Sequence, residues 1–231
     1  MLWVVGDYWE SLAAFFLFAG FHSLAAREPF KQALARSTSP FFVDHFWRLI
    51  YCAVSFVWYY QVIGTLHWGL HPGNDAWLVR YPDWSWQVIT SIHVGSVVLI
   101  YAAFLQSDYL EFLGLRQAWL GVQALRGRAN TYPPLRQFGA QRLEVSGVYG
   151  WVRHPMLVGG LLFLLTCRPT QNTLVFTLMY AAYMIVGSHY EERRLIQIFG
   201  PDYGAYRNRV GGFVPRLGLA KPIEAIDLTR Q

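Results

Sequence analysis

Long stretches without any Asp, Glu, Lys or Arg most constrain the fold of this chain. Four of them separate Glu10 from Arg27, Arg48 from Asp75, Asp83 from Asp108, and Arg168 from Glu191. Each can hold an apolar helix close to the roughly 20 residues that cross a bilayer. A shorter stretch between Arg153 and Arg168 needs flanking arginines that reach the interface or a locally thinned bilayer, or is only partly inserted. Only 14% of the residues are charged, against about 25% in soluble domains, so we expect a membrane protein.

The pattern predicts an all-α integral membrane helical bundle that forms a single domain over residues 1–231. Its five membrane-spanning helices are expected near residues 9–26, 46–69, 87–106, 155–167 and 173–190. Asp7 and Glu10 precede the first span where a signal peptide would be positive, so we expect no cleavage there. Apolar residues at helical spacing over 109–125 predict an amphipathic helix on the membrane surface.

Basic residues alternate between rich and poor connections, which predicts the orientation. The first connection holds Arg27, Lys31 and Arg36, whereas the second has only Arg80. The third connection and the C-terminal tail are rich in arginine, and Arg168 stands alone in the fourth turn. This is the positive-inside pattern of a chain with its N-terminus outside and its C-terminus in the cytoplasm. Because the bias accounts for the net charge of +5, we expect no nucleic-acid partner.

A polar cluster, Arg153-His154-Pro155, leads directly into the fourth predicted span. Pro155 suits the first position of a helix, and the free amides there, with the guanidinium of Arg153, favour an anionic group. Polar groups at the edge of a bilayer are costly, so they mark a functional site. Arg153 as a simple interfacial anchor remains an alternative.

A second polar cluster, Glu191-Glu192, follows the fifth predicted span, and Tyr203 and Tyr206 come soon after. The carboxylate of Glu191 is a natural acceptor for two vicinal hydroxyls, such as a ribose diol. The alternatives are that Glu191 pairs with Arg153 or Arg194 and that the tyrosines belong to an aromatic belt. We expect no metal site and no disulfide, and interpret the only cysteines, Cys52 and Cys167, as packing residues.

The pattern Gly-Val-Tyr-x-x-x-Arg-His-Pro, followed by Glu-Glu-Arg-x-Leu-x-x-x-Phe-Gly-x-x-Tyr-x-x-Tyr, resembles membrane methyltransferases related to isoprenylcysteine carboxyl methyltransferase. The resemblance covers about 143–215. The segments Phe-His-Ser-Leu-Ala-Ala-Arg (21–27) and Glu-Phe-Leu-Gly-Leu-Arg-Gln (111–117) look like bacterial methanethiol S-methyltransferases. The chain departs from the family pattern at Leu157, where a tyrosine is frequent, and at Gly211, where a proline is common.

The resemblance implies S-adenosylmethionine as the methyl donor, bound on the cytoplasmic side of a bacterial inner membrane. The residues it assigns to cofactor binding are Tyr149, Arg153, His154, Pro155, Gly159, Glu191, Glu192, Tyr203 and Tyr206. Since a thiolate is the nucleophile in thiol methylation, residues that accept the proton or steady the thiolate are needed. The candidates for this catalytic role are His22, Glu111 and Arg116.

Three functions stay open at this point. The first is methylation of a small thiol such as methanethiol, which reaches the site through the membrane. The second keeps the donor and replaces the thiol by a lipid or prenylated acceptor. The third is a non-catalytic membrane protein that binds haem or a quinone through His22, His93 and His189. Membrane lipids are expected partners, and the sequence does not determine the oligomeric state.

Overall fold

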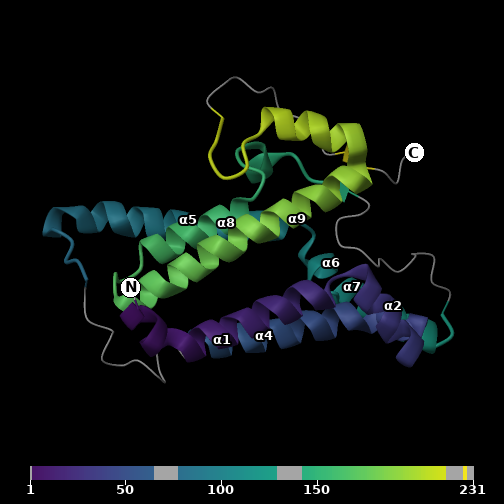
Figure 1. Ribbon diagram of the computed structural model, residues 1–231. Helices are drawn as coiled ribbons and strands as arrows, with labels where there is room; N and C mark the ends of the chain where they lie inside the picture. Colours follow the sequence, from purple (N-terminus) through teal and green to yellow (C-terminus); the bar gives the residue numbers. More distant parts are fainter. Residues whose placement is uncertain (1, 65–77, 129–141, 217–225, 228–231) are drawn as a thin grey trace. The chain divides into compact units, whose positions relative to one another are not determined.

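The computed structural model describes residues 2–64, 78–128, 142–216 and 226–227, drawn in colour in Figure 1. The chain, predicted as one domain, packs as two compact units: unit 1 comprises residues 1–75 and 108–138, and unit 2 comprises residues 76–107 and 139–231. The predicted all-α class is confirmed, since the regular structure among the described residues is helical apart from small β pairings. These are β1 (Arg142–Leu143) with β2 (Ile226–Asp227), and a bridge between Val152 and Gly211.

Unit 1 is built on α1 (Leu2–Ala25) and α4 (Arg48–Gly64), which pack along each other (Figure 1). In the sequence, α1 and α4 are connected by α2 (Glu28–Ser37), α3 (Pro40–Phe42) and a π-helical turn, Val43–Trp47. Trp47 donates a hydrogen bond from Nε1 to the Ala25 carbonyl, 3.1 Å away, which satisfies one acceptor at the end of α1. The last residues of the predicted second span, 65–69, lie outside the described residues.

The prediction of one amphipathic helix over 109–125 is wrong, because two helices occupy this segment. α6 (Tyr109–Phe112) and α7 (Leu115–Leu125) are separated by Gly114, whose φ is 79°. A Cβ on Gly114 would lie 2.5 Å from the backbone nitrogen of Leu49. The left-handed turn and the close approach to α4 both require glycine here.

Unit 2 contains α5 (Trp86–Gln106), α8 (Pro155–Leu165) and α9 (Gln171–Arg209), which lie side by side in Figure 1. Short 3₁₀ turns occur at Asp83–Ser85 and Gly147–Gly150. The third predicted span matches α5, and α8 begins at Pro155 as predicted. Gly159 lets α8 approach α5 closely, since a Cβ there would meet Cγ1 of Ile100 at 2.7 Å.

α9 continues far beyond the predicted end of the fifth span and breaks at Gly200, where φ is 51° and ψ is −124°. The residue after the break is Pro201, which suits the start of a new helical segment. Figure 1 shows the final turns of α9 folding back along the unit. This return closes a small core made of Leu143, Val145, Phe199, Tyr203, Tyr206 and Val210.

Among the described residues, one helical stretch, Asp83–Gln106, is long and apolar enough to cross a membrane alone. The segments Tyr8–Ala25 and Glu28–Ser37 pass the same test only as a pair bent by 76°, and Pro155–Leu165 is apolar but shorter. On α5, large apolar side chains such as Val98 and Leu105 are exposed. An exposed apolar surface of this kind suits lipid, so the fold carries a membrane-type helix, while the predicted number of spans and their orientation remain predictions.

Candidate functional site

The centre of the site in unit 2 is an ion pair between Arg153, just before α8, and Glu192 on α9. Nε and Nη2 of Arg153 donate to the same oxygen, Oε1 of Glu192, at 2.9 and 2.6 Å. Nη1 donates to the carbonyls of Arg207 and Val210 at the end of α9, where a cation is favoured by the helix dipole. Arg207 approaches Oε2 of Glu192 at 3.4 Å. The guanidinium thus ties two helices and the following segment together.

The segment after α9 holds this arginine in place through its backbone. The Arg153 amide donates to the Gly211 carbonyl at 2.8 Å, and the His154 amide donates to the Gly212 carbonyl at 3.2 Å. A Cβ on Gly212 would lie 3.3 Å from Nη2 of Arg153. The ring of Phe213 packs on the imidazole of His154, with 5.4 Å between ring centroids. The approach of residues 211–213 therefore closes one side of the cluster.

His154 lies between the two neighbouring carboxylates of α9. Its Nε2 is 3.1 Å from Oε1 of Glu192 and its Nδ1 is 3.5 Å from Oε2 of Glu191. Burial by itself lowers the pKa of His154, but the hydrogen bonds and charges of Glu191 and Glu192 outweigh it, and the pKa is raised. For Glu192, burial acts to raise the pKa, and the contacts with Arg153 and His154 reverse this and lower it. The cluster therefore favours an imidazolium between two carboxylates.

The three tyrosines assigned to the cofactor are packed into the frame of the site. The Tyr206 hydroxyl donates to the Tyr149 carbonyl at 2.7 Å, and the Tyr149 hydroxyl donates to the Ala103 carbonyl at 3.3 Å. Burial raises the pKa of Tyr149 to about 12 and raises the pKa values of Tyr203 and Tyr206 as well, so all three stay protonated. Their rings connect α9 to the residues before α8.

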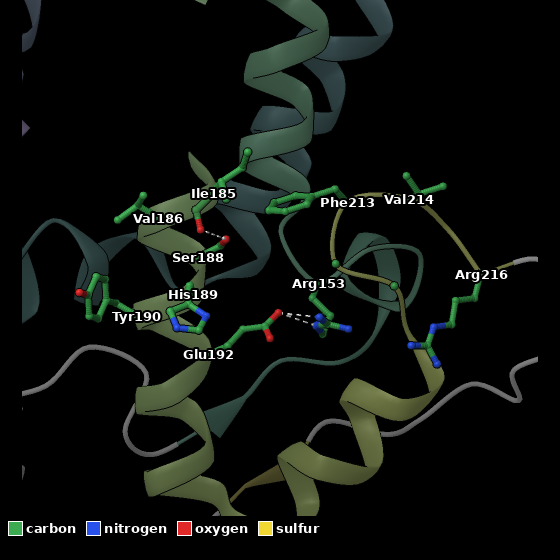
Figure 2. A pocket seen from close by; sticks show the side chains of 12 residues that line it. Arg153, Ile185, Val186, Ser188, His189, Tyr190, Glu192, Phe213, Val214 and Arg216 are labelled. Atoms are coloured by element: carbon green, nitrogen blue, oxygen red, sulfur yellow. Dashed lines mark hydrogen bonds and ion pairs between the residues drawn. The ribbon is translucent and has the colours of Figure 1, made fainter. Parts of the chain in front are cut away.

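A cavity of about 820 Å³ opens beside the ion pair, within the roughly 300–1,000 Å³ range of small-molecule sites. Figure 2 shows Arg153 and Glu192 reaching toward each other, with Phe213 and Val214 above Arg153 in this view. Ile185, Val186, Ser188, His189 and Tyr190 line it from α9, and Gly211, Gly212 and Arg216 from the last segment. Charged groups thus meet apolar walls around one space.

The nine residues assigned to the cofactor all lie in unit 2. Two of them, Arg153 and Glu192, line the cavity, and His154 and Glu191 contact the same cluster. Pro155 starts α8, and Gly159 lies at the contact of α8 with α5. Sequence reasoning missed Arg207 and Phe213. It also missed Ser188 and Ile185, which lie four and seven residues before Glu192 and therefore share its helix face.

The three residues assigned to catalysis lie in unit 1. His22 faces hydroxyl groups of α4, while Arg116 forms a 2.8 Å ion pair with Asp108. Glu111 is buried, and its backbone amide donates to the Asp108 carboxylate at 3.2 Å. Glu111 and Arg116 thus share Asp108 as a neighbour.

Fold and site are those of a helical protein that carries a membrane-type helix and a cavity lined by charged and apolar side chains. The chain belongs to the NnrU protein family, whose profile matches residues 11–217. It is 32% identical over 210 residues to methanethiol S-methyltransferase 2 of Bradyrhizobium diazoefficiens, covering 87% of this chain and 70% of that protein. It is 33% identical over 203 residues to methanethiol S-methyltransferase of Pseudomonas deceptionensis, with the same coverage.

A third relative, the methanethiol S-methyltransferase of Mycobacterium tuberculosis, is 28% identical over 200 residues, which cover 86% of this chain and 74% of that protein. No solved structure matches the chain. The relatives confirm the resemblance that the sequence motifs indicated.

Proposed function

We propose that this protein is a membrane methyltransferase that transfers a methyl group from S-adenosylmethionine to a small thiol such as methanethiol. The names of its relatives support both the reaction and the substrate. The observation that carries the proposal is the cavity of about 820 Å³ lined by Arg153 and Glu192. Its lining includes one residue from each of the two motifs of the resemblance, Arg153 and Glu192, which are 39 positions apart in the sequence.

The residues around the cavity fit S-adenosylmethionine. Among the described residues, Arg153, Arg207 and His154 gather around the two carboxylates of Glu191 and Glu192, so the cluster presents cationic groups that suit a free carboxylate. Ile185, Val186 and Phe213 provide apolar walls for a flat base. When bound, the cofactor supplies a methyl group on a positively charged sulfur.

Within this site we assign different roles to the two adjacent carboxylates. Both oxygens of Glu192 have cationic neighbours, so Glu192 orients Arg153 and His154. Glu191 is 45% exposed and keeps acceptor capacity for a diol beyond its contact with His154. Arg153 uses both Nη1 protons, its Nε proton and one Nη2 proton inside the protein, so it offers a ligand at most one further donor.

The thiol must lose its proton before it attacks. His22, Glu111 and Arg116 remain the proposed residues for this step. We further propose the five-span topology with the N-terminus outside, and a location in a bacterial inner membrane with the site on the cytoplasmic side. The alternation of basic residues supports this arrangement.

Calorimetric titration of the purified protein with S-adenosylhomocysteine tests the cofactor, and labelled S-adenosylmethionine with a panel of acceptors tests the substrate. We expect saturable binding and a volatile methylated product from methanethiol. If the methyl group is transferred only to prenylated or lipid acceptors, the proposed thiol substrate is wrong and the second function applies. If the protein does not bind S-adenosylhomocysteine and shows a haem absorbance band, the haem-binding alternative applies and the proposed enzyme activity is wrong.

A further inference from the structure

A thiol that attacks a methyl donor in the cavity of unit 2 needs a proton acceptor at the same place. In the proposed methylation, the thiol sulfur must lie within about 3–3.5 Å of the methyl group when it attacks. The group that takes its proton therefore borders the space that holds the donor. For the cavity beside the ion pair of Arg153 and Glu192, the side chains to consider are the described residues that line it.

Most of the described polar side chains in this lining do not accept a proton. Arg153 and Arg216 carry guanidinium groups, which stay protonated in proteins. The Ser188 hydroxyl donates to the Ile185 carbonyl at 3.0 Å, and a hydroxyl is a very weak base. Tyr190 contributes a phenol, whose oxygen is likewise a weak base.

The carboxylate of the lining and the neighbouring imidazole are already committed to each other. Both oxygens of Glu192 lie within 3.4 Å of cationic groups, and these contacts outweigh burial and lower its pKa. A carboxylate that is stabilised in its ionised form is a poor proton acceptor. His154 has Glu191 and Glu192 beside its ring nitrogens, and the two carboxylates outweigh burial and raise its pKa. His154 is therefore favoured as an imidazolium, which has no proton to gain.

His189 is the remaining ionisable group among the described residues that line the cavity. It lies on α9 three residues before Glu192, and residues at this spacing share a helix face. Figure 2 shows His189 on α9 between Ser188 and Glu192. Its ring is exposed, forms no hydrogen bond within the described part of the chain, and meets the Tyr190 ring edge-on at 6.0 Å. Its nitrogens thus remain open to a ligand, and imidazole is the side chain suited to proton exchange near neutral pH.

We propose that His189 accepts the thiol proton in the proposed methylation, on which this inference rests. The S–H bond breaks as the proton moves to a ring nitrogen of His189, which becomes an imidazolium. The electron pair left on the thiol sulfur forms the bond to the methyl group. The bond between that methyl group and the donor sulfur breaks, and its electron pair stays on the departing S-adenosylhomocysteine. Because His189 is exposed at the end of the fifth predicted span, solvent then takes the proton, and the step needs no group outside unit 2.

The acidity of the thiol provides the test. An alkanethiol is mostly protonated near neutral pH and needs a proton acceptor, whereas an arenethiol ionises in solution and does not. The experiment compares kcat/KM for one alkanethiol and one arenethiol in the wild-type protein and in H189Q, whose amide stays polar but does not take the proton. H93Q is the matched control. It removes another imidazole of unit 2, whose Nδ1 lies 2.9 Å from the Thr166 hydroxyl at the opposite end of α8 from Arg153.

We expect H189Q to lower kcat/KM for the alkanethiol by about 10²-fold, within the usual contribution of acid–base catalysis, and to leave the arenethiol within about twofold. The affinity of H189Q for S-adenosylhomocysteine should not change, and H93Q should leave both thiols unaffected.

Full alkanethiol activity of H189Q would overturn this assignment and return the step to His22, Glu111 and Arg116. Equal losses on both thiols, lost affinity for S-adenosylhomocysteine, or the same selective loss in H93Q would also overturn it, because each points to a structural effect. A wild-type protein that binds S-adenosylhomocysteine and methylates neither thiol would instead overturn the proposed substrate, and the role of His189 with it.

Discussion

Oε1 of Glu192 lies 2.6 Å from Nη2 of Arg153 and 3.1 Å from Nε2 of His154, so one carboxylate oxygen joins both cations of the cluster. Glu191, the preceding residue, contacts only His154 among these two and is three times as exposed as Glu192. Consecutive helical residues point about 100° apart, so α9 directs one carboxylate inward and the other toward solvent.

The two carboxylates should respond differently to neutralisation. E192Q removes the charge that compensates Arg153 and His154, so we expect the free energy of unfolding to fall by about 2 kcal/mol. This is below the roughly 3–5 kcal/mol for a fully buried pair, because both side chains keep some exposure. E191Q, the matched variant, should leave the thermal midpoint nearly unchanged and weaken S-adenosylhomocysteine binding in calorimetry. Equal midpoints for both variants would contradict the distinction.

Stability should peak between the pKa ranges of the two central groups. The raised pKa of His154 means that its stabilisation is complete below its usual value of 6.5 and is lost as pH rises through the higher folded value. The lowered pKa of Glu192 means that its contribution is present above 4.5 and is lost as pH falls through the lower folded value. Thermal unfolding in detergent, measured from below the usual pKa of Glu to above that of His, follows both the loss of stability at acid pH and the loss at alkaline pH. H154Q should flatten the alkaline limb while the acid limb remains.

Local sequence patterns predicted those parts of the fold and the site that depend on neighbouring residues in the chain, namely where helices begin and which segments are apolar. A proline after a polar pair predicts a helix start, and α8 begins at Pro155. The absence of charge between Asp83 and Asp108 predicted α5. The assignment of Arg153 to a ligand carboxylate came from its residue type, and that type equally suits Glu192 and the end of α9, which the structure gives it.

The remaining features depend on contacts between distant segments. No pattern in the sequence indicates that Gly211 and Gly212 pair with the backbone of Arg153 and His154, because any residue offers a carbonyl. The motif Phe-Gly-Pro marks a break in α9, but the direction of the returning helix follows from the apolar packing of Tyr203 and Tyr206. The rotation of α9 about its axis decides which of the two adjacent carboxylates faces Arg153. Because both residues are glutamates, the sequence does not distinguish them.

We expect position 200 to require glycine because of its backbone conformation and not because a side chain would collide with its surroundings. Nothing lies within 4 Å of a Cβ built there, but its φ of 51° is unfavourable for any residue with a side chain. We expect G200A to lower the free energy of unfolding by about 1–3 kcal/mol, the usual cost of a residue held in a sparsely populated backbone region. G204A is the matched control, since Gly204 also has open space but lies within the helix, and alanine should stabilise there by up to about 1 kcal/mol. Urea or thermal unfolding compares them, and similar effects of the two variants would refute the conformational explanation.

A variant at Gly159 can show whether this residue serves the packing of α8 on α5 or the binding of the cofactor. A Cβ there would approach Cγ1 of Ile100 to 2.7 Å and the Ser96 carbonyl to 3.1 Å. We expect G159A to push α8 away from α5 and lower the free energy of unfolding by about 1–3 kcal/mol, as overpacking does. G187A, on α9 with nothing within 4 Å, is the control and should not destabilise. Calorimetry on the folded variant then decides the role: if G159A keeps its thermal midpoint and loses only S-adenosylhomocysteine affinity, Gly159 faces the ligand; if the midpoint falls first and affinity survives at low temperature, it serves the helix contact.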